Sequence, residues 1–221
     1  MPEVLPSLVV YTLWKVGSMS AHYEIAARGG ARIHGQHPPV AAYPGLRDGR
    51  VSAGLICNPL VWYASLYEAA RFRNRCDDVD FPTFVEQCFD GGFDRVGVIA
   101  EAGDVEDFRA SGVGLATWCA WWMYSIDRRW AVDYLVPRDM LDAGLALLLG
   151  DDEQRRENQH ENSNVQRDYA DYYNGRPDLV ERILDADAPL FRVGGWVDLG
   201  PALSPLIAVR GRALTTPALA A

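Results

Sequence analysis

The chain has a single lysine, Lys15, among 221 residues, and its other basic residues are all arginines. This scarcity excludes a phosphate-binding loop of the GxxxxGK[ST] type, because valine and not serine or threonine follows the only lysine. The four cysteines contain no CxxC pair, so a cysteine-based zinc or redox site is not expected. Cys57, Cys88 and Cys119 lie in apolar runs, which is typical of reduced core thiols.

Catalytic signature motifs are also missing. The chain has neither a GxSxG nucleophile elbow nor a GxGxxG dinucleotide loop, and "GVGLA" at 112–116 lacks the third glycine. No set of serine, histidine and acid occurs in a familiar order. The sequence therefore contains no motif that identifies a catalytic reaction, and no cofactor is expected.

Composition and charge narrow the class of protein. With 49% hydrophobic residues the chain can bury a large core, so it is expected to be globular rather than disordered. A formal net charge of −9 argues against nucleic acid as the main partner and against an anionic membrane surface, although local basic patches are left open. The longest nearly uncharged run, 110–126, is short and interrupted by glycine, so no membrane segment is expected. The first apolar run follows an acidic residue, which predicts no signal peptide and a protein made inside the cell.

Hydrophobic periodicity and capping residues predict an α+β fold: a mixed or mainly antiparallel sheet packed with several helices and joined by long Gly/Pro-rich loops. The predicted strands are 8–16, 50–57, 130–136 and a hairpin over 93–108. The predicted helices are 20–28, 59–75, a segment from Asp80 to Asp90, 138–149 and 178–189. Periodicity does not decide whether 112–126 is a strand or a buried helix.

Three regions follow from the composition. Residues 1–150 are predicted to form a single α+β core domain, and 151–177 a polar linker or surface loop. Residues 178–221 are predicted to form a C-terminal helix, short strands and an Ala/Pro-rich tail, packed on the core or on a partner.

The segment "TWCAWWMYSIDRRW", 117–130, holds four of the seven tryptophans. Whether it is a strand or a helix, large apolar side chains point to both sides, so it is expected to be buried on two faces. A central core element and a subunit interface are both compatible with this pattern, and a platform for ligand stacking ranks behind them. The candidate interface residues are Trp118, Trp121, Trp122, Arg128, Arg129 and Trp130.

A metal site has only a weak basis in the sequence. His34 and His37 form an HxxH in a Gly/Pro-rich loop, with acidic residues at Asp77, Asp78 and Asp80. A loop lacks the fixed geometry that a helical HExxH gives two histidine ligands. No metal is therefore expected.

Three short stretches, "LWKV" at 13–16, "GGARI" at 29–33 and "VWYASLYEAARF" at 61–72, resemble the layout of RES-type ADP-ribosyltransferases. The resemblance covers about a quarter of the chain and implies NAD binding by Arg32, Tyr63 and Glu68, with Lys15 where the family has its first arginine. An arginine clamps a pyrophosphate with two parallel hydrogen bonds, whereas a lysine supplies only a point charge.

Two functions from different classes remain. The favoured one is a non-catalytic structural subunit that assembles with itself or with other proteins, with a virion or phage particle as the expected setting. The alternative is a small enzyme, most specifically an NAD-dependent ADP-ribosyltransferase-like protein.

Overall fold

Three parallel strands form the centre of a six-stranded mixed sheet whose order is β3-β1-β2-β4-β7-β8. The computed structural model describes residues 2–33, 37–73, 76, 78–90, 105–150 and 169–214. The sheet strands are β1 (Glu3–Val4), β2 (Leu8–Thr12), β3 (Ala31–Arg32), β4 (Val51–Ile56), β7 (Tyr134–Pro137) and β8 (Ile207–Ala208). β2, β4 and β7 run parallel, while β1, β3 and β8 join them in antiparallel pairs at the two edges. The chain is therefore an α+β protein, as the sequence predicts.

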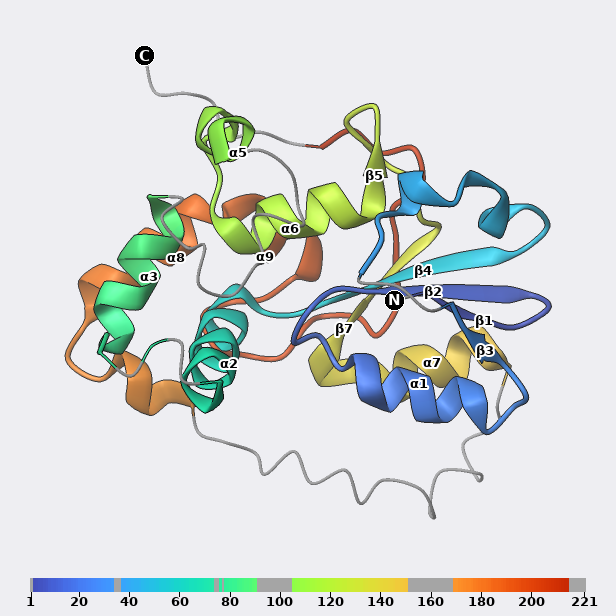
Figure 1. Ribbon diagram of the computed structural model, residues 1–221, viewed down its shortest axis with the longest axis horizontal. Helices are drawn as coiled ribbons and strands as arrows, with labels where there is room; N and C mark the ends of the chain where they lie inside the picture. The colour runs from blue at the N-terminus through green and yellow to red at the C-terminus, as the bar shows by residue number, and fades with distance from the viewer. Residues whose placement is uncertain are drawn as a thin grey trace.

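Helices cover both faces of this sheet. The α-helices are α1 (Ser18–Ala26), α2 (Pro59–Phe72), α3 (Phe81–Phe89), α5 (Val105–Ser111), α6 (Leu115–Tyr124), α7 (Leu141–Leu149), α8 (Pro177–Ala186) and α9 (Ala188–Gly194). Short 3₁₀ helices are η1 (Val40–Ala42), η2 (Pro44–Arg47), η4 (Arg138–Met140) and η6 (Tyr169–Tyr173). Figure 1 shows α1 and α7 on one face of the sheet and α6 on the other, with α2, α3 and α8 grouped beyond one end of the strands.

The capping residues that the sequence contains define the helix ends. The side chain of Asn58 accepts a hydrogen bond from the Leu60 amide at the start of α2, and that of Asp80 accepts one from Thr83 at the start of α3. Gly150 ends α7 in the left-handed conformation, with φ 68°. These three predictions are confirmed, and each follows from a backbone group that the helix itself leaves unpaired.

The undecided segment 112–126 forms helix α6 and then runs into a small hairpin. Strands β5 (Ser125–Ile126) and β6 (Arg129–Trp130) pair antiparallel across a turn in which Asp127 and Arg128 both have positive φ, 50° and 57°. Two successive left-handed residues are typical of the tight turns that match the twist of a hairpin. The aromatic segment therefore changes from helix to strand at Ser125.

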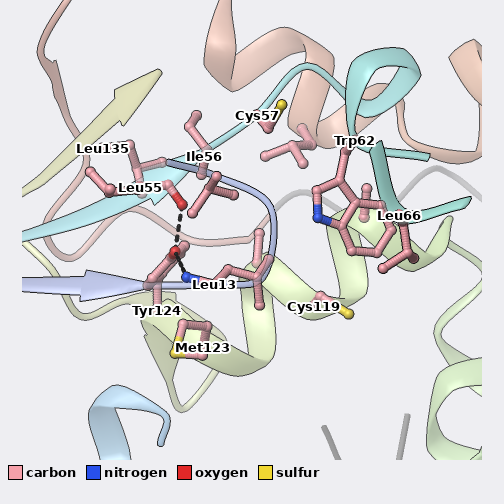
Figure 2. Packing of buried hydrophobic residues seen from close by; sticks show 14 of the residues in the cluster. Leu13, Leu55, Ile56, Cys57, Trp62, Leu66, Cys119, Met123, Tyr124 and Leu135 are labelled. Atoms are coloured by element: carbon pink, nitrogen blue, oxygen red, sulfur yellow. Dashed lines mark hydrogen bonds between the residues drawn. The ribbon is translucent and has the colours of Figure 1, made fainter. Parts of the chain in front are cut away.

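Tyr124, at the end of α6, joins the helix to the sheet. Its hydroxyl accepts a hydrogen bond from the Leu13 amide at 3.1 Å and donates one to the Leu55 carbonyl, as the dashed lines in Figure 2 show. Gly54 provides the space, because a Cβ atom there would lie 2.8 Å from the Tyr124 ring. The predicted strand 8–16 ends early, at Thr12, where Tyr124 takes the next amide of the chain.

The amino end of α6 is held by a buried carboxylate from a distant part of the chain. Asp187, between α8 and α9, accepts hydrogen bonds from the Thr117 amide at 2.7 Å and from the Tyr63 hydroxyl at 3.0 Å. The Tyr63 hydroxyl in turn accepts one from the Leu115 amide at 3.0 Å. Burial raises the pKa of Asp187 to about 6, although its hydrogen bonds with Thr117 and Tyr63 act in the opposite direction. Gly114 lies directly against this carboxylate, because a Cβ atom built on Gly114 would be only 2.2 Å from an Asp187 oxygen.

The structure corrects two predictions. Within the predicted hairpin over 93–108, residues 93–104 lie outside the described part of the chain, and the remainder belongs to helix α5, with Glu106 and Asp107 in its first turn. Acidic side chains in that position favour a helix, because they face its unpaired amide groups.

The second correction concerns Pro189. This proline does not end the predicted helix 178–189. It lies in the first turn of α9, where the backbone amide makes no hydrogen bond within the helix and proline is therefore tolerated. Residues 190–194 are therefore helical rather than extended, and β8 is the one strand that the structure describes beyond them.

Candidate functional site

The parallel strands β2, β4 and β7 end at one edge of the sheet, and each leads into a helix there. The following helices are α1, α2 and, after η4, α7. Open α/β sheets bind their ligands outside the carboxyl ends of parallel strands, because loops and helix amino ends meet there. This edge is therefore where a small-molecule site is expected in a sheet of this kind.

Side chains from two other elements, α2 and η4, hold the segment that follows β2. The Trp62 indole donates to the Trp14 carbonyl at 2.9 Å, and the Arg138 guanidinium donates to the Lys15 carbonyl at 3.2 Å. Lys15 has φ 62°, a left-handed conformation that lysine seldom adopts. Strained backbone of this kind persists only where its surroundings impose it, and it often marks a functional segment.

His37 lies over this segment as a neutral imidazole. Its Nδ1 is 2.8 Å from the Thr12 carbonyl oxygen, so Nδ1 carries the proton and Nε2 carries the lone pair. Burial lowers the pKa of His37 to about 4. At neutral pH the ring is therefore uncharged, and its tautomer is fixed by the backbone of β2.

An aromatic face, which we define as Trp14, His37, Trp118 and Trp122, connects this edge to the outer side of α6. The Trp14 ring is 4.9 Å from His37 and stacks on Trp122 at 6.0 Å with an interplanar angle of 9°. Trp118 contacts Phe108 of α5 at 6.2 Å, and its indole N–H is buried with no hydrogen-bond acceptor. All four members of the aromatic face are only partly buried.

The six candidate interface residues divide into three groups. Trp121 and Trp130 belong to the core, with 7% and 6% of their surface exposed. Trp118 and Trp122 are half-buried members of the aromatic face, and Arg128 and Arg129 are exposed on the β5–β6 hairpin. The expectation that the segment has apolar groups on two sides agrees with this placement.

The three residues that the transferase resemblance singles out lie in separate surroundings. Arg32, on the edge strand β3, donates to the buried carboxylate of Glu3 at 2.6 Å. Tyr63 is fully buried, and its hydroxyl donates a hydrogen bond to Asp187. Glu68, further along α2, accepts from the Tyr172 hydroxyl at 3.1 Å. Each of the three side chains thus has a different protein partner: Glu3, Asp187 and Tyr172.

The weak metal candidates gain no support. His34 lies outside the described residues, and His37 is oriented by the backbone of β2. Within the described ranges no group of three or more histidine, cysteine or acidic side chains could hold a metal ion. Helices of the described chain are also too short or too polar to cross a membrane.

Sequence reasoning missed Trp14, and it could not have found its stacking on Trp122, which lies more than a hundred residues away. A usable signal was its place near the carboxyl end of the predicted strand 8–16, close to where parallel sheets place ligand-binding residues. Known protein families, curated proteins and solved structures show no significant match to this chain. The function must therefore be inferred from the residues of this chain and their geometry.

Proposed function

We propose that the protein is a non-catalytic subunit that assembles with further copies of itself through the aromatic face. The supporting observation is that Trp118 and Trp122 lie one turn apart on α6, both only partly buried, and that Trp122 stacks on the partly buried Trp14. Tryptophan and arginine dominate the energetics of protein interfaces, and α6 leads directly to the exposed Arg128 and Arg129. Most soluble oligomers are built from identical chains, which makes a second copy the partner to test first. A virion or phage particle as the setting stays a prediction from the sequence.

Size-exclusion chromatography with light scattering tests this proposal. We expect the wild-type protein to have a mass above the 24.5 kDa of one chain and to dissociate on dilution. Trp122→Ala should shift the equilibrium to the monomer, because it removes the indole that stacks on Trp14. Phe72→Ala is the matched control: this aromatic side chain is 90% exposed at the end of α2 and lies outside the aromatic face. A wild-type protein that stays monomeric at all concentrations would overturn the proposal.

A small enzyme is the second candidate, favoured by the neutral imidazole of His37 at the carboxyl end of β2. Its geometry suits a general base, since the Thr12 carbonyl fixes the proton on Nδ1 and leaves the lone pair on Nε2. Lys15 supplies a positive charge on the neighbouring strained segment. The activity that the sequence resemblance implies would add NAD as the substrate.

Calorimetry with NAD distinguishes two versions of the enzyme proposal: a transferase-like site and a site at the end of β2. Loss of binding in Arg32→Ala or Glu68→Ala would support the transferase layout, whereas loss in His37→Ala alone would support a site at the end of β2. Circular dichroism must first show that each variant is folded. An absence of binding heat with the wild-type protein would discard NAD as the substrate.

A further inference from the structure

A hollow of about 340 Å³ lies beside the edge of the sheet formed by β7 and β8. Its walls are formed by Asp133, Tyr134, Ala208, Val209, Arg210 and Arg212. None of the four members of the aromatic face lines this hollow.

Backbone pairing concentrates arginines around it. The segment 209–214 runs along β6: the Gly211 amide donates to the Trp130 carbonyl at 2.9 Å, and the Trp130 amide donates to the Arg212 carbonyl at 3.0 Å. This pairing brings Arg210 and Arg212 beside the hairpin arginines, and the Arg129 guanidinium donates to the Gly211 carbonyl at 2.9 Å. Arginines from two distant parts of the sequence thus lie on neighbouring segments, and Arg210 and Arg212 line the hollow.

Few negative charges offset them. Arg210 forms an ion pair with Asp133 at 2.7 Å. By contrast, within the part of the chain that the structure describes, neither the Arg128 nor the Arg212 side chain has a hydrogen bond or ion pair, and both are exposed. The surface therefore carries excess positive charge in a chain whose formal net charge is −9.

Asp133 forms an ion pair with one of these arginines. Its Oδ2 accepts from the Ser52 amide at 2.8 Å and from the Ser52 hydroxyl at 2.7 Å, while its Oδ1 receives Arg210. Burial acts to raise the pKa of Asp133, but the hydrogen bonds from Ser52 and Arg210 outweigh it and hold the pKa below its usual range. The carboxylate is therefore ionised at neutral pH and pairs with the Arg210 guanidinium at the wall of the hollow.

We propose that this hollow binds a phosphate group, carried either by a small phosphorylated ligand or by a nucleic acid backbone. A guanidinium presents a planar fork of N–H donors, and the oxygens of one phosphate can serve two forks at once. A carboxylate has only two oxygens and is saturated more readily by a single arginine. Arg210 and Arg212 supply the two guanidinium groups, and Tyr134 offers a ring at the wall for the remainder of the ligand.

Titrations with inorganic pyrophosphate and with a fluorescent ten-nucleotide oligothymidylate test the proposal at low salt. Arg212→Ala should weaken binding about tenfold, the loss of one charge-assisted interaction. Arg192→Ala is the matched control, since this exposed arginine binds a carbonyl of its own helix α9 and lies outside the hollow. It should leave the affinity unchanged within about twofold.

The two ligands distinguish the sources of the phosphate. Equal or tighter binding of pyrophosphate supports a small phosphorylated ligand, whereas tighter binding of the oligonucleotide, with a steep dependence on salt, supports a nucleic acid. The proposal is overturned if neither ligand binds, if Arg212→Ala binds like the wild type, or if oligoglutamate binds as tightly as either phosphate compound. None of these results depends on whether the protein self-associates, so the phosphate-binding proposal and the self-assembly proposal can fail independently of each other.

Discussion

At its amino end helix α6 is held by Asp187 and Tyr63, which are fully buried, whereas at its carboxyl end it runs into a hairpin whose arginines are exposed. Around Asp187 each carboxylate oxygen has a donor and the space is completely filled. Around the hairpin, the side chains of Arg128 and Arg212 have no partner among the described residues, and Arg212 lies at the wall of a hollow. A buried polar group without a partner costs stability, but an exposed one does not. The first end is therefore expected to serve stability, and the second is free to serve binding.

The largest effect is expected from Gly114→Ala at the closed end. The added methyl group would lie 2.2 Å from the Asp187 carboxylate, in a place where neither side can move far. We expect the free energy of unfolding, measured with a chemical denaturant, to fall by about 3 kcal/mol. Gly45→Ala is the control, because its Cβ would meet only an Asp48 oxygen at 3.8 Å. Equal losses for the two variants would contradict this description of the closed end.

The charge of Asp187 makes the closed end sensitive to pH. Its pKa is about 6 in the folded protein, above the ordinary value of 3.8, so between these values the folded chain keeps a proton that the unfolded chain releases. The free energy of unfolding should therefore fall as the pH rises through this window, by on the order of 2 kcal/mol from this group. Denaturant titrations from pH 4 to pH 7 should show a shallower fall in Asp187→Asn. An identical profile in the variant would assign the effect to other groups.

Tyr63→Phe should have a smaller effect at the same end. It removes the donor to Asp187 and the acceptor of the Leu115 amide, while the ring stays in place. We expect a loss of about 1.5 kcal/mol in the free energy of unfolding. Tyr23→Phe, at a tyrosine that is 54% exposed on α1, should change it by less than about 0.5 kcal/mol. A Tyr63→Phe protein as stable as the wild type would show that the network carries little energy.

The smallest effect on stability is expected at the open end. The double variant Arg210→Ala, Arg212→Ala removes one exposed ion pair and one unpaired guanidinium. Its free energy of unfolding should stay within about 0.5 kcal/mol of the wild type, because exposed pairs contribute little. A loss comparable to that of Gly114→Ala would mean that this surface holds the fold together, and the contrast between the two ends would fail.

Local signals in the sequence predict much of the fold, because helix starts and stops depend on neighbouring residues. Asn58, Asp80 and Gly150 act within a few positions of the groups that they satisfy. Helix α5 was missed because its single buried residue, Phe108, gives no periodic pattern. The prediction that Pro189 ends a helix was wrong for a related reason, since a proline can follow the end of one helix or lie in the first turn of the next.

The candidate sites could not be predicted in the same way, because they combine residues that are far apart in the sequence. Asp187 meets Thr117 across 70 positions, and Arg210 meets Asp133 across 77. Their side chains are ordinary acidic and basic residues whose roles appear only once the chain has folded. Composition alone, with its net negative charge, even points away from the basic surface around the hollow.

The hydroxyl of Tyr124 has a practical consequence for following the motions of this protein. It is the acceptor for the Leu13 amide, the first backbone group after β2. Exchange of that amide with deuterated solvent requires the Tyr124 side chain to withdraw, and with it the last turn of α6. The Leu13 amide is thus a built-in reporter: its exchange rate measures how often the helix that carries the aromatic face leaves the sheet, without any label or substitution.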